Sequence, residues 1–251
     1  MWCILMNSDR LSKRLATVAN YVPKGAILVD IGSDHAYLPC FLAKNTGITY
    51  AVAGEVAVGP YQSAKGNVLS EGLSEIISVR LGDGLDVVKP GEVEYVTIAG
   101  MGGALITSIL EKGKEKLGSV KRLILQPNIS AISIRQWLLD NSWKLVAEEI
   151  LEEDGKIYEV LVAEKGKDAI DPLIPYGQSL EEGLLLGPYL VKERNTVFKK
   201  KWINEKKNWQ RIYQQLENAV QTPDTIEKKQ ELLHKIKLVK EVIQDEESKW
   251  S

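Results

Sequence analysis

Four polar segments, each directly after a short apolar run, carry residue types that can bind a cofactor. Asp30-Ile31-Gly32 ends the first run, Glu55 follows the second, Gly82-Asp83-Gly84 the third and Gly100-Met101-Gly102-Gly103 the fourth. Carboxylates at the first three points can accept hydrogen bonds from an amino group, from ribose hydroxyls and from an adenine amino group. Ligands of open α/β sheets bind beyond the carboxyl ends of the strands. We expect the four segments to converge on one crevice that takes a nucleoside-containing cofactor.

The first of these turns departs from a dinucleotide-binding pattern, because Asp34 and His35 stand where glycine is expected. A carboxylate at a helix N-terminus repels a pyrophosphate. S-adenosylmethionine has no phosphate, and its cationic amino group and sulfonium make Asp30 and Asp34 favourable neighbours. The turn favours S-adenosylmethionine as the cofactor. The enzyme alternative, a Rossmann-like transferase or oxidoreductase with another adenine nucleotide, requires a more glycine-rich turn.

A parallel sheet is predicted to position these turns. Short runs without strict alternation, typical of strands covered on both faces, span residues 26–31, 49–54, 76–81, 94–99 and 121–126. Segments with helical spacing lie between them, at residues 56–72, 103–117 and 130–141. Two further strands, 143–151 and 156–164, are joined by a hairpin turn at 152–155. Parallel strands closed by an antiparallel hairpin predict an α/β fold with the Rossmann-like sheet of a class I methyltransferase.

Three parts are predicted: a methyltransferase domain at residues 1–166, a connector at 167–190, and a coiled-coil-like antiparallel helical hairpin at 191–251. Prolines and glycines interrupt the connector. In the hairpin, amphipathic segments lie on either side of the helix-stop signal Thr222-Pro223-Asp224. A first helix is expected from about 9 to 21 with its cap at Asn7-Ser8, which favours Met6 as the natural start.

Composition narrows the class of protein. The 251 residues are 44% hydrophobic, enough to bury a core, and the net charge of -2 gives no overall sign of nucleic-acid binding. Cys3 and Cys40 are the only cysteines, as in proteins with reduced thiols, and two histidines make a structural zinc site unexpected. The sequence has no signal-peptide pattern and no run of about 18 apolar residues. We predict a cytoplasmic, monomeric protein without a metal or a membrane contact.

Five segments together resemble one family of RNA-modifying enzymes. They are residues 11–15 (LSKRL), 30–37 (DIGSDHAY), 82–85 (GDGL), 98–103 (IAGMGG) and 126–128 (QPN). From about Met6 onward the chain resembles the bacterial tRNA (adenine-22-N1) methyltransferase family. The resemblance implies S-adenosylmethionine as the cofactor and tRNA as the partner, with methyl transfer to N1 of an adenosine in the D-arm.

Residues of the strand-end turns are the expected cofactor contacts: Asp30, Gly32, Tyr37, Glu55, Asp83, Gly84, Ala99, Gly100 and Met101. Adenine N1 carries an in-plane lone pair, so the enzyme must supply in-line geometry rather than a strong base. Attack leaves positive charge on the base, which a carboxylate stabilises. Asp34 is the predicted catalytic group, and His35 is expected to stack on the base or hydrogen-bond it. The alternatives are that Asp34 only caps a helix, that His35 fills the pocket wall and that Tyr37 packs on the sheet.

Basic residues and turns are the expected tRNA contacts: Arg10, Lys13, Arg14, Gly102, Gly103, Gln126, Pro127, Asn128, Lys199, Lys200 and Lys201. Residues 191–213 hold eight lysines and arginines against two glutamates, a local charge of +6 that suits phosphates. A lysine-rich helix is as often only a solvated face. Trp202 and Trp209 fit the seam between two helices better than base stacking, and His234 is expected in a core.

Two other functions stay open at this point. One is a methyltransferase that acts on another acceptor. The other is a non-enzymatic RNA- or protein-binding scaffold with a vestigial cofactor site, in which the helical hairpin is the working part.

Overall fold

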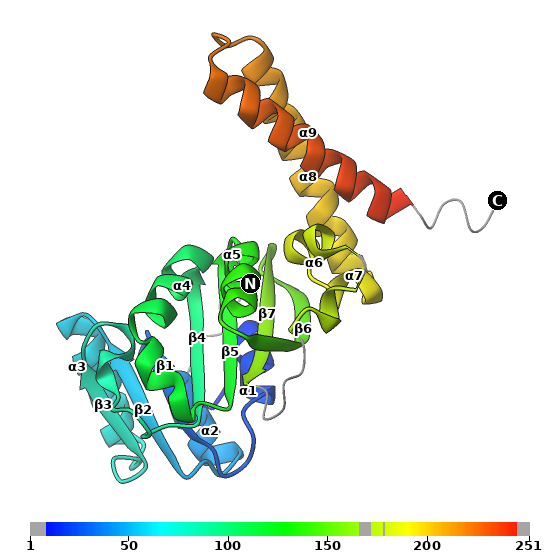
Figure 1. Ribbon diagram of the computed structural model, residues 1–251. Coiled ribbons are helices and arrows are strands. Elements are labelled where there is room, and N and C mark those ends of the chain that lie inside the picture. The colour runs from blue at the N-terminus through cyan, green and yellow to red at the C-terminus, as the bar shows by residue number, and fades with distance from the viewer. Residues whose placement is uncertain (1–8, 166–171, 178, 245–251) are drawn as a thin grey trace. The chain divides into compact units, whose positions relative to one another are not determined.

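The computed structural model describes residues 9–165, 172–177 and 179–244. The chain divides between Pro175 and Tyr176 into two compact units. The first unit is built on a β-sheet and the second is helical (Figure 1). Among the described residues, no helix is both long and apolar enough to cross a membrane.

A seven-stranded sheet forms the centre of the first unit, in the order β3-β2-β1-β4-β5-β7-β6. Its strands are β1 (Ile27–Ile31), β2 (Tyr50–Glu55), β3 (Ile77–Leu81), β4 (Tyr95–Gly102), β5 (Arg122–Ile129), β6 (Trp143–Glu153) and β7 (Lys156–Lys165). The strands β1 to β5 are parallel, and β7 runs antiparallel to both of its neighbours. The predicted strands and the class I methyltransferase sheet are confirmed, with each strand beginning within one residue of its expected start.

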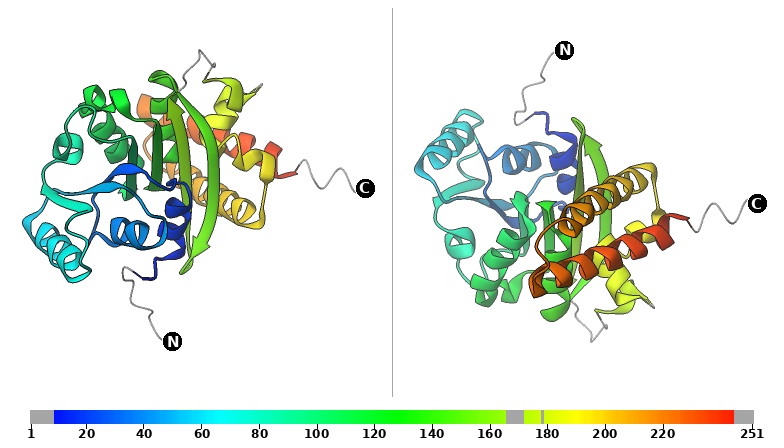
Figure 2. Two further views of the ribbon diagram at one scale, coloured as in Figure 1. Left: turned by 90° about the horizontal axis from the view of Figure 1, so that it is seen from below. Right: turned by 90° about the horizontal axis from the view of Figure 1, so that it is seen from above.

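Helices cover both faces of this sheet. On one face lie α1 (Lys13–Asn20), α2 (Tyr37–Asn45) and α3 (Val58–Ser70), whose buried side chains join one hydrophobic cluster (Figure 2). On the other face lie α4 (Gly103–Lys112) and α5 (Ala131–Asp140), with the short 3-10 helices η1 (Gly84–Val87) and η2 (Lys114–Ser119). The middle strands are buried on both faces, as their continuous apolar runs predict.

The register of the strands aligns their carboxyl ends. Ile31 of β1 pairs with Gly54 on one side and with Ile98 on the other. One strand further, Ala99 of β4 pairs with Gln126 of β5. The turns that follow β1, β2, β4 and β5 consequently lie next to one another at one edge of the sheet.

The turn between β6 and β7 has the predicted form. Asp154 and Gly155 have φ of 49° and 73°, the positive values that a two-residue type I′ hairpin requires. Asp and Gly are the residue types that tolerate this conformation best, which explains why this turn is readable from sequence.

The first helix is shorter than predicted. It begins at Lys13 rather than near Asp9, because the Ser12 hydroxyl accepts a hydrogen bond from Leu15 N (3.2 Å) and caps the helix there. The predicted cap, Asn7-Ser8, lies outside the described residues.

The second unit contains α6 (Leu180–Leu186), α7 (Leu190–Glu193), α8 (Thr196–Glu217) and α9 (Pro223–Gln244), after the 3-10 helix η3 (Ile174–Tyr176) at the unit boundary. The long helices α8 and α9 pack on each other as the predicted hairpin. Within the predicted connector, α6 buries Leu185 and Leu186, so these residues form packed structure.

Two aromatic predictions for this unit have different outcomes. Trp202 is 4% exposed and its ring centroid lies 6.1 Å from that of Trp209, which agrees with a seam rather than a base-stacking surface. The core position expected for His234 is wrong. Its side chain is half exposed, and Nε2 lies 2.5 Å from Glu181 Oε1 on α6, a polar partner that a surface position allows.

Candidate active site at the carboxyl ends of the parallel strands

Asp30 lies at the end of β1 and is almost fully buried. Thr97 Oγ1 donates a hydrogen bond to Asp30 Oδ1 (2.6 Å), and Ser33 Oγ donates one to Oδ2 (2.7 Å). Burial raises the pKa of Asp30 to about 6, although these two hydrogen bonds and the positive charge of Arg14 oppose the shift. A cation bound at this point would favour the ionised carboxylate.

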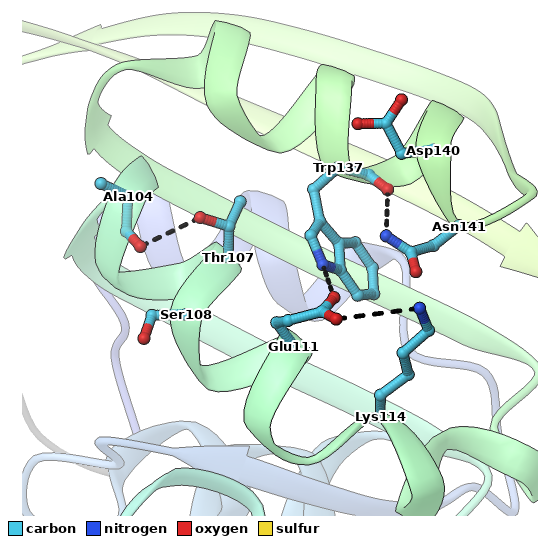
Figure 3. A pocket seen from close by; sticks show the side chains of 8 residues that line it. All are labelled: Ala104, Thr107, Ser108, Glu111, Lys114, Trp137, Asp140 and Asn141. Carbon is cyan, nitrogen blue, oxygen red and sulfur yellow. Dashed lines mark hydrogen bonds and ion pairs between the residues drawn. The ribbon is translucent and has the colours of Figure 1, made fainter.

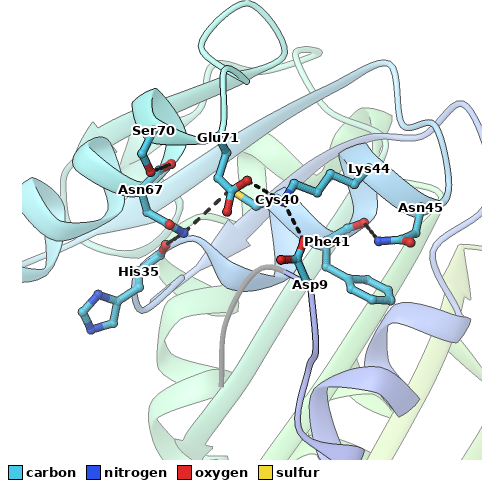
Figure 4. A network of polar contacts seen from close by, with 9 residues as sticks. All are labelled: Asp9, His35, Cys40, Phe41, Lys44, Asn45, Asn67, Ser70 and Glu71. Atoms are coloured by element: carbon cyan, nitrogen blue, oxygen red, sulfur yellow. Dashed lines mark hydrogen bonds and ion pairs between the residues drawn. The ribbon is translucent and has the colours of Figure 1, made fainter. Parts of the chain in front are cut away.

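The turn after Gly32 has an uncommon backbone. Asp34, His35 and Ala36 have φ of 38°, 60° and 56°, three successive non-glycine residues in the left-handed region. Two side chains hold this turn: Glu55 Oε1 accepts a hydrogen bond from Asp34 N (2.5 Å), and Asn67 Nδ2 donates one to His35 O (2.8 Å) (Figure 4). The left-handed turn was not apparent from the sequence, since none of its residues is glycine.

The side chains of this turn lie at the surface. Asp34 and His35 side chains are 75% and 46% exposed, with 3.6 Å between Oδ1 and Nε2. The His35 ring stacks on that of Tyr37 at 5.2 Å between centroids. The alternative in which Asp34 caps a helix is wrong, because α2 begins at Tyr37 and its N-cap, Ala36, makes no side-chain cap. Asp34 is thereby left as an exposed carboxylate at the edge of the predicted crevice.

Glu55 and Asp83 follow β2 and β3. Glu55 is 6% exposed, and burial is the main reason why its pKa is raised, opposed by the hydrogen bond from Asp34 N. Its second oxygen has no assigned bond among the described contacts and is the acceptor suited to a ribose. Asp83 is exposed and lies 3.4 Å from Lys112 Nζ, a surface ion pair of small energy.

The turn after β4 is braced by side chains from β5. Gly100 N donates a hydrogen bond to Gln126 Oε1 (3.0 Å), and Asn128 Nδ2 donates one to Gly100 O (2.7 Å). Gln126 is fully buried, and its Oε1 also accepts from Arg14 Nη1 (2.5 Å). Gly100 has φ of 80°, which its missing side chain permits. The two amide side chains predicted to contact the acceptor therefore fix the backbone of the turn at Gly100.

Two glycines of the predicted site have different structural reasons. Gly32 has φ of 67°, in the left-handed region that favours glycine, and a Cβ there would meet only the terminal methyl of the flexible Met101 side chain. A Cβ on Gly103 would lie 2.1 Å from the carbonyl oxygen of Ser130. Close approach of the backbone after β4 to the backbone after β5 therefore explains Gly103.

The three basic residues predicted around the first helix do not form one surface. Arg10 precedes α1, and Lys13 is exposed with its Nζ 3.4 Å from Glu152 O. Arg14 points inward, since its guanidinium bonds Gln126 and lies 5.5 Å from the centre of the Tyr158 ring. A buried amide and an aromatic ring therefore hold Arg14 beside the β4 and β5 turns, away from the exposed Lys13.

The lysines of α8 also point in different directions, because successive residues are 100° apart on a helix. Lys201 Nζ lies 4.7 Å from the centre of the Trp202 ring, whereas Lys200 is exposed. Lys200, Lys207 and Arg211 are all exposed and follow i, i+7, i+11 spacing, so they share one stripe. The structure adds this exposed basic stripe (Lys200, Lys207 and Arg211) to the residues predicted from sequence.

Sequence reasoning missed a buried ion cluster. Arg135 is fully buried, and its guanidinium lies 2.6 Å from Glu148 Oε1 on β6 and 2.8 Å from Glu159 Oε2 on β7. The two carboxylates raise the pKa of Arg135 against the opposing effect of its burial. An arginine in an amphipathic helix normally faces solvent, so no local signal marks this cluster.

A groove lies between α4 and α5 (Figure 3). Its lining residues are Ala104, Thr107, Ser108, Glu111, Lys114, Trp137, Asp140 and Asn141. Trp137 Nε1 donates to Glu111 Oε2 (2.8 Å), and Asn141 Nδ2 donates to Trp137 O (2.8 Å). None of these lining residues belongs to the predicted site.

Most of the predicted cofactor residues do come together at the carboxyl edge. Asp30, Gly32, Glu55, Ala99 and Gly100 lie on or directly after neighbouring strands, and the pairing of these strands brings their carboxyl ends side by side. No group of three His, Cys, Asp or Glu side chains in the described part of the chain is arranged to hold a metal ion. The edge offers a buried carboxylate, a buried acceptor at Glu55 and an exposed carboxylate at Asp34. These groups suit a ligand that carries a ribose and a cationic amino group, which fits S-adenosylmethionine.

Comparisons with known proteins agree with this geometry. Residues 28–241 match the family described as tRNA (adenine(22)-N(1))-methyltransferase. The protein of that name from Bacillus subtilis is 54% identical over 95% of this chain and 99% of its own length. The crystal structure of the B. subtilis M1A22 tRNA methyltransferase TrmK superimposes with a TM-score of 0.88, covering 94% of this chain and 99% of that one.

A second structure bears on the cofactor. The Streptococcus pneumoniae protein solved in complex with S-adenosyl-L-methionine is 46% identical, with a TM-score of 0.77 over 93% of this chain and 100% of that chain. The resemblance inferred from five short segments is confirmed over nearly the whole sequence. This chain belongs to the tRNA (adenine(22)-N(1))-methyltransferase family.

Proposed function

We propose that this protein transfers the methyl group of S-adenosylmethionine to N1 of adenosine 22 in the D-arm of tRNA. The observation that carries the proposal is the left-handed turn at residues 34–36. This turn follows the buried Asp30 closely in sequence, places the backbone N–H of Asp34 on the buried Glu55 carboxylate, and leaves the Asp34 carboxylate exposed. Family membership supplies the position of the adenosine and the tRNA substrate.

The cofactor residues have separate tasks. Asp30 supplies negative charge for the amino group, and the second oxygen of Glu55 accepts from the ribose. Asp83, Gly84, Tyr37, Ala99 and Met101 complete the proposed cofactor contacts. The bound cofactor contributes an electrophilic methyl group on a sulfonium. Gly32 and Gly100 keep the turns close enough for the backbone to shape the crevice.

The acceptor base needs positioning and charge stabilisation. Because adenine N1 has a lone pair in the ring plane, attack needs no base but leaves positive charge on the ring. Asp34 is placed to stabilise that charge and to accept a proton from N6, and His35 offers a ring for stacking. Gly100 to Gly103, braced by Gln126 and Asn128, form the backbone wall of the acceptor pocket.

Contacts with tRNA need positive charge away from the pocket. We assign phosphate contacts to the basic stripe and, on the first unit, to Arg10 and Lys13. N1 lies on the Watson–Crick edge of adenine, so the target must be unpaired before it reacts. The proposed site is that of a monomer, since every proposed catalytic group comes from one chain, and we place the reaction in the cytoplasm.

Asp34→Asn is expected to lower kcat about tenfold, because it removes the negative charge that stabilises the methylated base. The effect is no larger because water partly screens this mostly exposed carboxylate. The affinity for S-adenosylmethionine should stay within about threefold, since Asp34 reaches Glu55 through its backbone N–H. Single-turnover rates and calorimetric titration measure the two quantities. Asp140→Asn, at an exposed position on α5, is the matched control. Full activity of the Asp34 variant would remove this carboxylate from the mechanism.

Neutralising the basic stripe, with Lys200→Gln, Lys207→Gln and Arg211→Gln together, is expected to weaken tRNA binding. Three lost phosphate contacts would reduce the slope of log affinity against log salt by about 2. Filter binding at several salt concentrations measures this slope. Lys199→Gln, Lys201→Gln and Lys206→Gln together remove the same charge from other sides of the same helix. Equal slopes for the two triple variants would mean that the stripe has no special role.

The function itself is tested by incubating the protein with an unmodified tRNA transcript and labelled S-adenosylmethionine, followed by nuclease digestion and mass spectrometry. The expected product is N1-methyladenosine, mapped to position 22. A label at another nucleoside would point to a different acceptor. Cofactor binding without label in any tRNA would exclude tRNA as the substrate, and no cofactor binding would favour the scaffold.

A further inference from the structure

The short 3-10 helix η1 packs against the ends of β2 and β3. A Cβ on Gly54 would lie 2.8 Å from Val87 Cγ2, and a Cβ on Gly82 would lie 3.0 Å from Val87 Cγ1. Val87, the last residue of η1, is 5% exposed. Gly54 precedes Glu55 and Gly82 precedes Asp83, the two carboxylates that we assign to the adenosine half of the cofactor. The Val87 side chain therefore lies against the backbone next to both carboxylates.

Arg80 of β3 ties the end of η1 to the sheet. Its Nη1 donates hydrogen bonds to Val87 O (2.8 Å) and to Glu92 Oε2 (2.9 Å). Its Nη2 donates hydrogen bonds to Glu92 Oε1 (2.6 Å) and to the Tyr50 hydroxyl of β2 (3.0 Å). The Arg80 and Glu92 side chains are only 28% and 21% exposed. A guanidinium that pairs with both oxygens of a carboxylate has a fixed orientation, so it holds the Val87 carbonyl in one place.

A second basic side chain reaches η1 from η2. Lys116 Nζ donates hydrogen bonds to Leu85 O (3.1 Å) and to Asp86 Oδ1 (2.9 Å). Asp86 is 73% exposed, so water competes for this ion pair. The Arg80 guanidinium, by contrast, joins β2, β3 and η1 in one half-buried network. We therefore expect Arg80 to be the main restraint on Val87.

We propose that Arg80 is a positioning residue for the adenosine half of S-adenosylmethionine, because it holds Val87 against the ends of β2 and β3 and thereby fixes the spacing of Glu55 and Asp83. The inference rests on the proposed function, in which these two carboxylates bind the ribose and the adenine amino group. Two acceptors bind one rigid nucleoside well only when their spacing matches it. Arg80 acts through Val87 and has no need to touch the cofactor.

The test compares two ligands by calorimetric titration: S-adenosylmethionine, and 5′-methylthioadenosine, which keeps the adenosine but lacks the amino acid. Arg80→Met is expected to weaken the binding of both ligands about fivefold, because both depend on the same two carboxylates. At saturating cofactor, its kcat on tRNA should stay within about twofold of the wild-type value, since Asp30 still binds the amino-acid half.

Arg122→Met is the matched control. Arg122 pairs with Glu164 and is 29% exposed, much like Arg80, but it is the first residue of β5 and lies at the strand end opposite to the cofactor turns. This variant should lower the melting temperature as Arg80→Met does and leave both affinities within about twofold of wild type.

A double variant separates positioning from stability. Arg80→Met with Glu92→Met removes the carboxylate that the single variant leaves half-buried without its partner, so the melting temperature should recover in part. Both affinities should stay low, because Val87 O still lacks its donor.

Unchanged affinities in a folded Arg80→Met variant would overturn the positioning role. A larger loss for S-adenosylmethionine than for methylthioadenosine would also overturn it, as would affinities that return together with stability in the double variant. Failure of the proposed cofactor contacts has a different signature: Glu55→Gln and Asp83→Asn would both leave the two affinities unchanged. That result would overturn these contacts, and the role of Arg80 with them.

Discussion

Arg135→Ala is expected to lower the free energy of unfolding of the first unit by about 3–5 kcal/mol. The substitution leaves Glu148 and Glu159 buried without the guanidinium that lies within 2.8 Å of both. Removing one partner of a buried ion cluster strongly lowers the stability of the fold, because the charge that remains has no water to solvate it. This loss is far larger than the stability that the intact cluster adds relative to an apolar core. Denaturant titration followed by circular dichroism measures the change.

A surface ion pair supplies the control for that measurement. Lys121 Nζ lies 2.6 Å from Glu94 Oε1, but both side chains are more than one-third exposed. Lys121→Ala should therefore lower the free energy of unfolding far less than Arg135→Ala does, because water screens this pair. Combining Arg135→Met with Glu148→Leu and Glu159→Leu removes all three charges and should restore much of the lost stability. A cost below about 1 kcal/mol for Arg135→Ala alone would show that the two glutamates escape to water or become protonated easily.

Asp30→Asn is expected to weaken binding of S-adenosylmethionine about 100-fold, or about 2.7 kcal/mol, because it removes the buried charge proposed to pair with the amino group. The wild-type affinity should also depend on pH. Burial raises the pKa of Asp30 to about 6, so the free protein holds this proton below that pH and must release it to pair with a cation. Affinity should be constant well above pH 6 and fall by up to tenfold per pH unit below it.

Calorimetric titration in buffers of different ionisation enthalpy measures both the affinity and the proton released. The Asn variant should release no proton, and its affinity should not change between pH 5 and pH 7.5.

Folding provides a second check on the same residue. A carboxyl whose pKa is raised in the folded state contributes stability below its unfolded value near 3.8, and this contribution is lost as pH rises through about 6. The Asn variant should lack that loss of stability. If its affinity for S-adenosylmethionine varied with pH as that of the wild type does, the cofactor amino group would have to lie elsewhere.

Much of this protein was predictable from local sequence. Strands buried on both faces leave continuous apolar runs, and the Asp154-Gly155 turn needs two positive φ values, so both are visible without partners. The same holds for the acidic and glycine residues at the strand ends, because the order of a parallel sheet forces those ends to one edge. The candidate cofactor site followed from these two facts together.

Other features had no local signal. The left-handed turn at 34–36 depends on Glu55 and Asn67, which are 21 and 32 residues away from their partners in sequence. The inward position of Arg14 depends on Gln126, 112 residues away. In each case a residue of a type common at protein surfaces is held by a hydrogen-bond partner that only the folded chain brings within 3 Å.

By itself the sequence determined the strands, the hairpin and the set of groups at the carboxyl edge, because these follow from hydrophobic patterning and chain connectivity. Only the tertiary structure decided that Gln126 and Asn128 brace a turn, that Gly103 serves close packing, and that Arg135 is buried. The physical reason is the separation along the sequence of the residues that interact. Hydrophobic periodicity acts over neighbouring residues, whereas the partner of a buried polar group is chosen by the geometry of strands and helices that are distant in sequence.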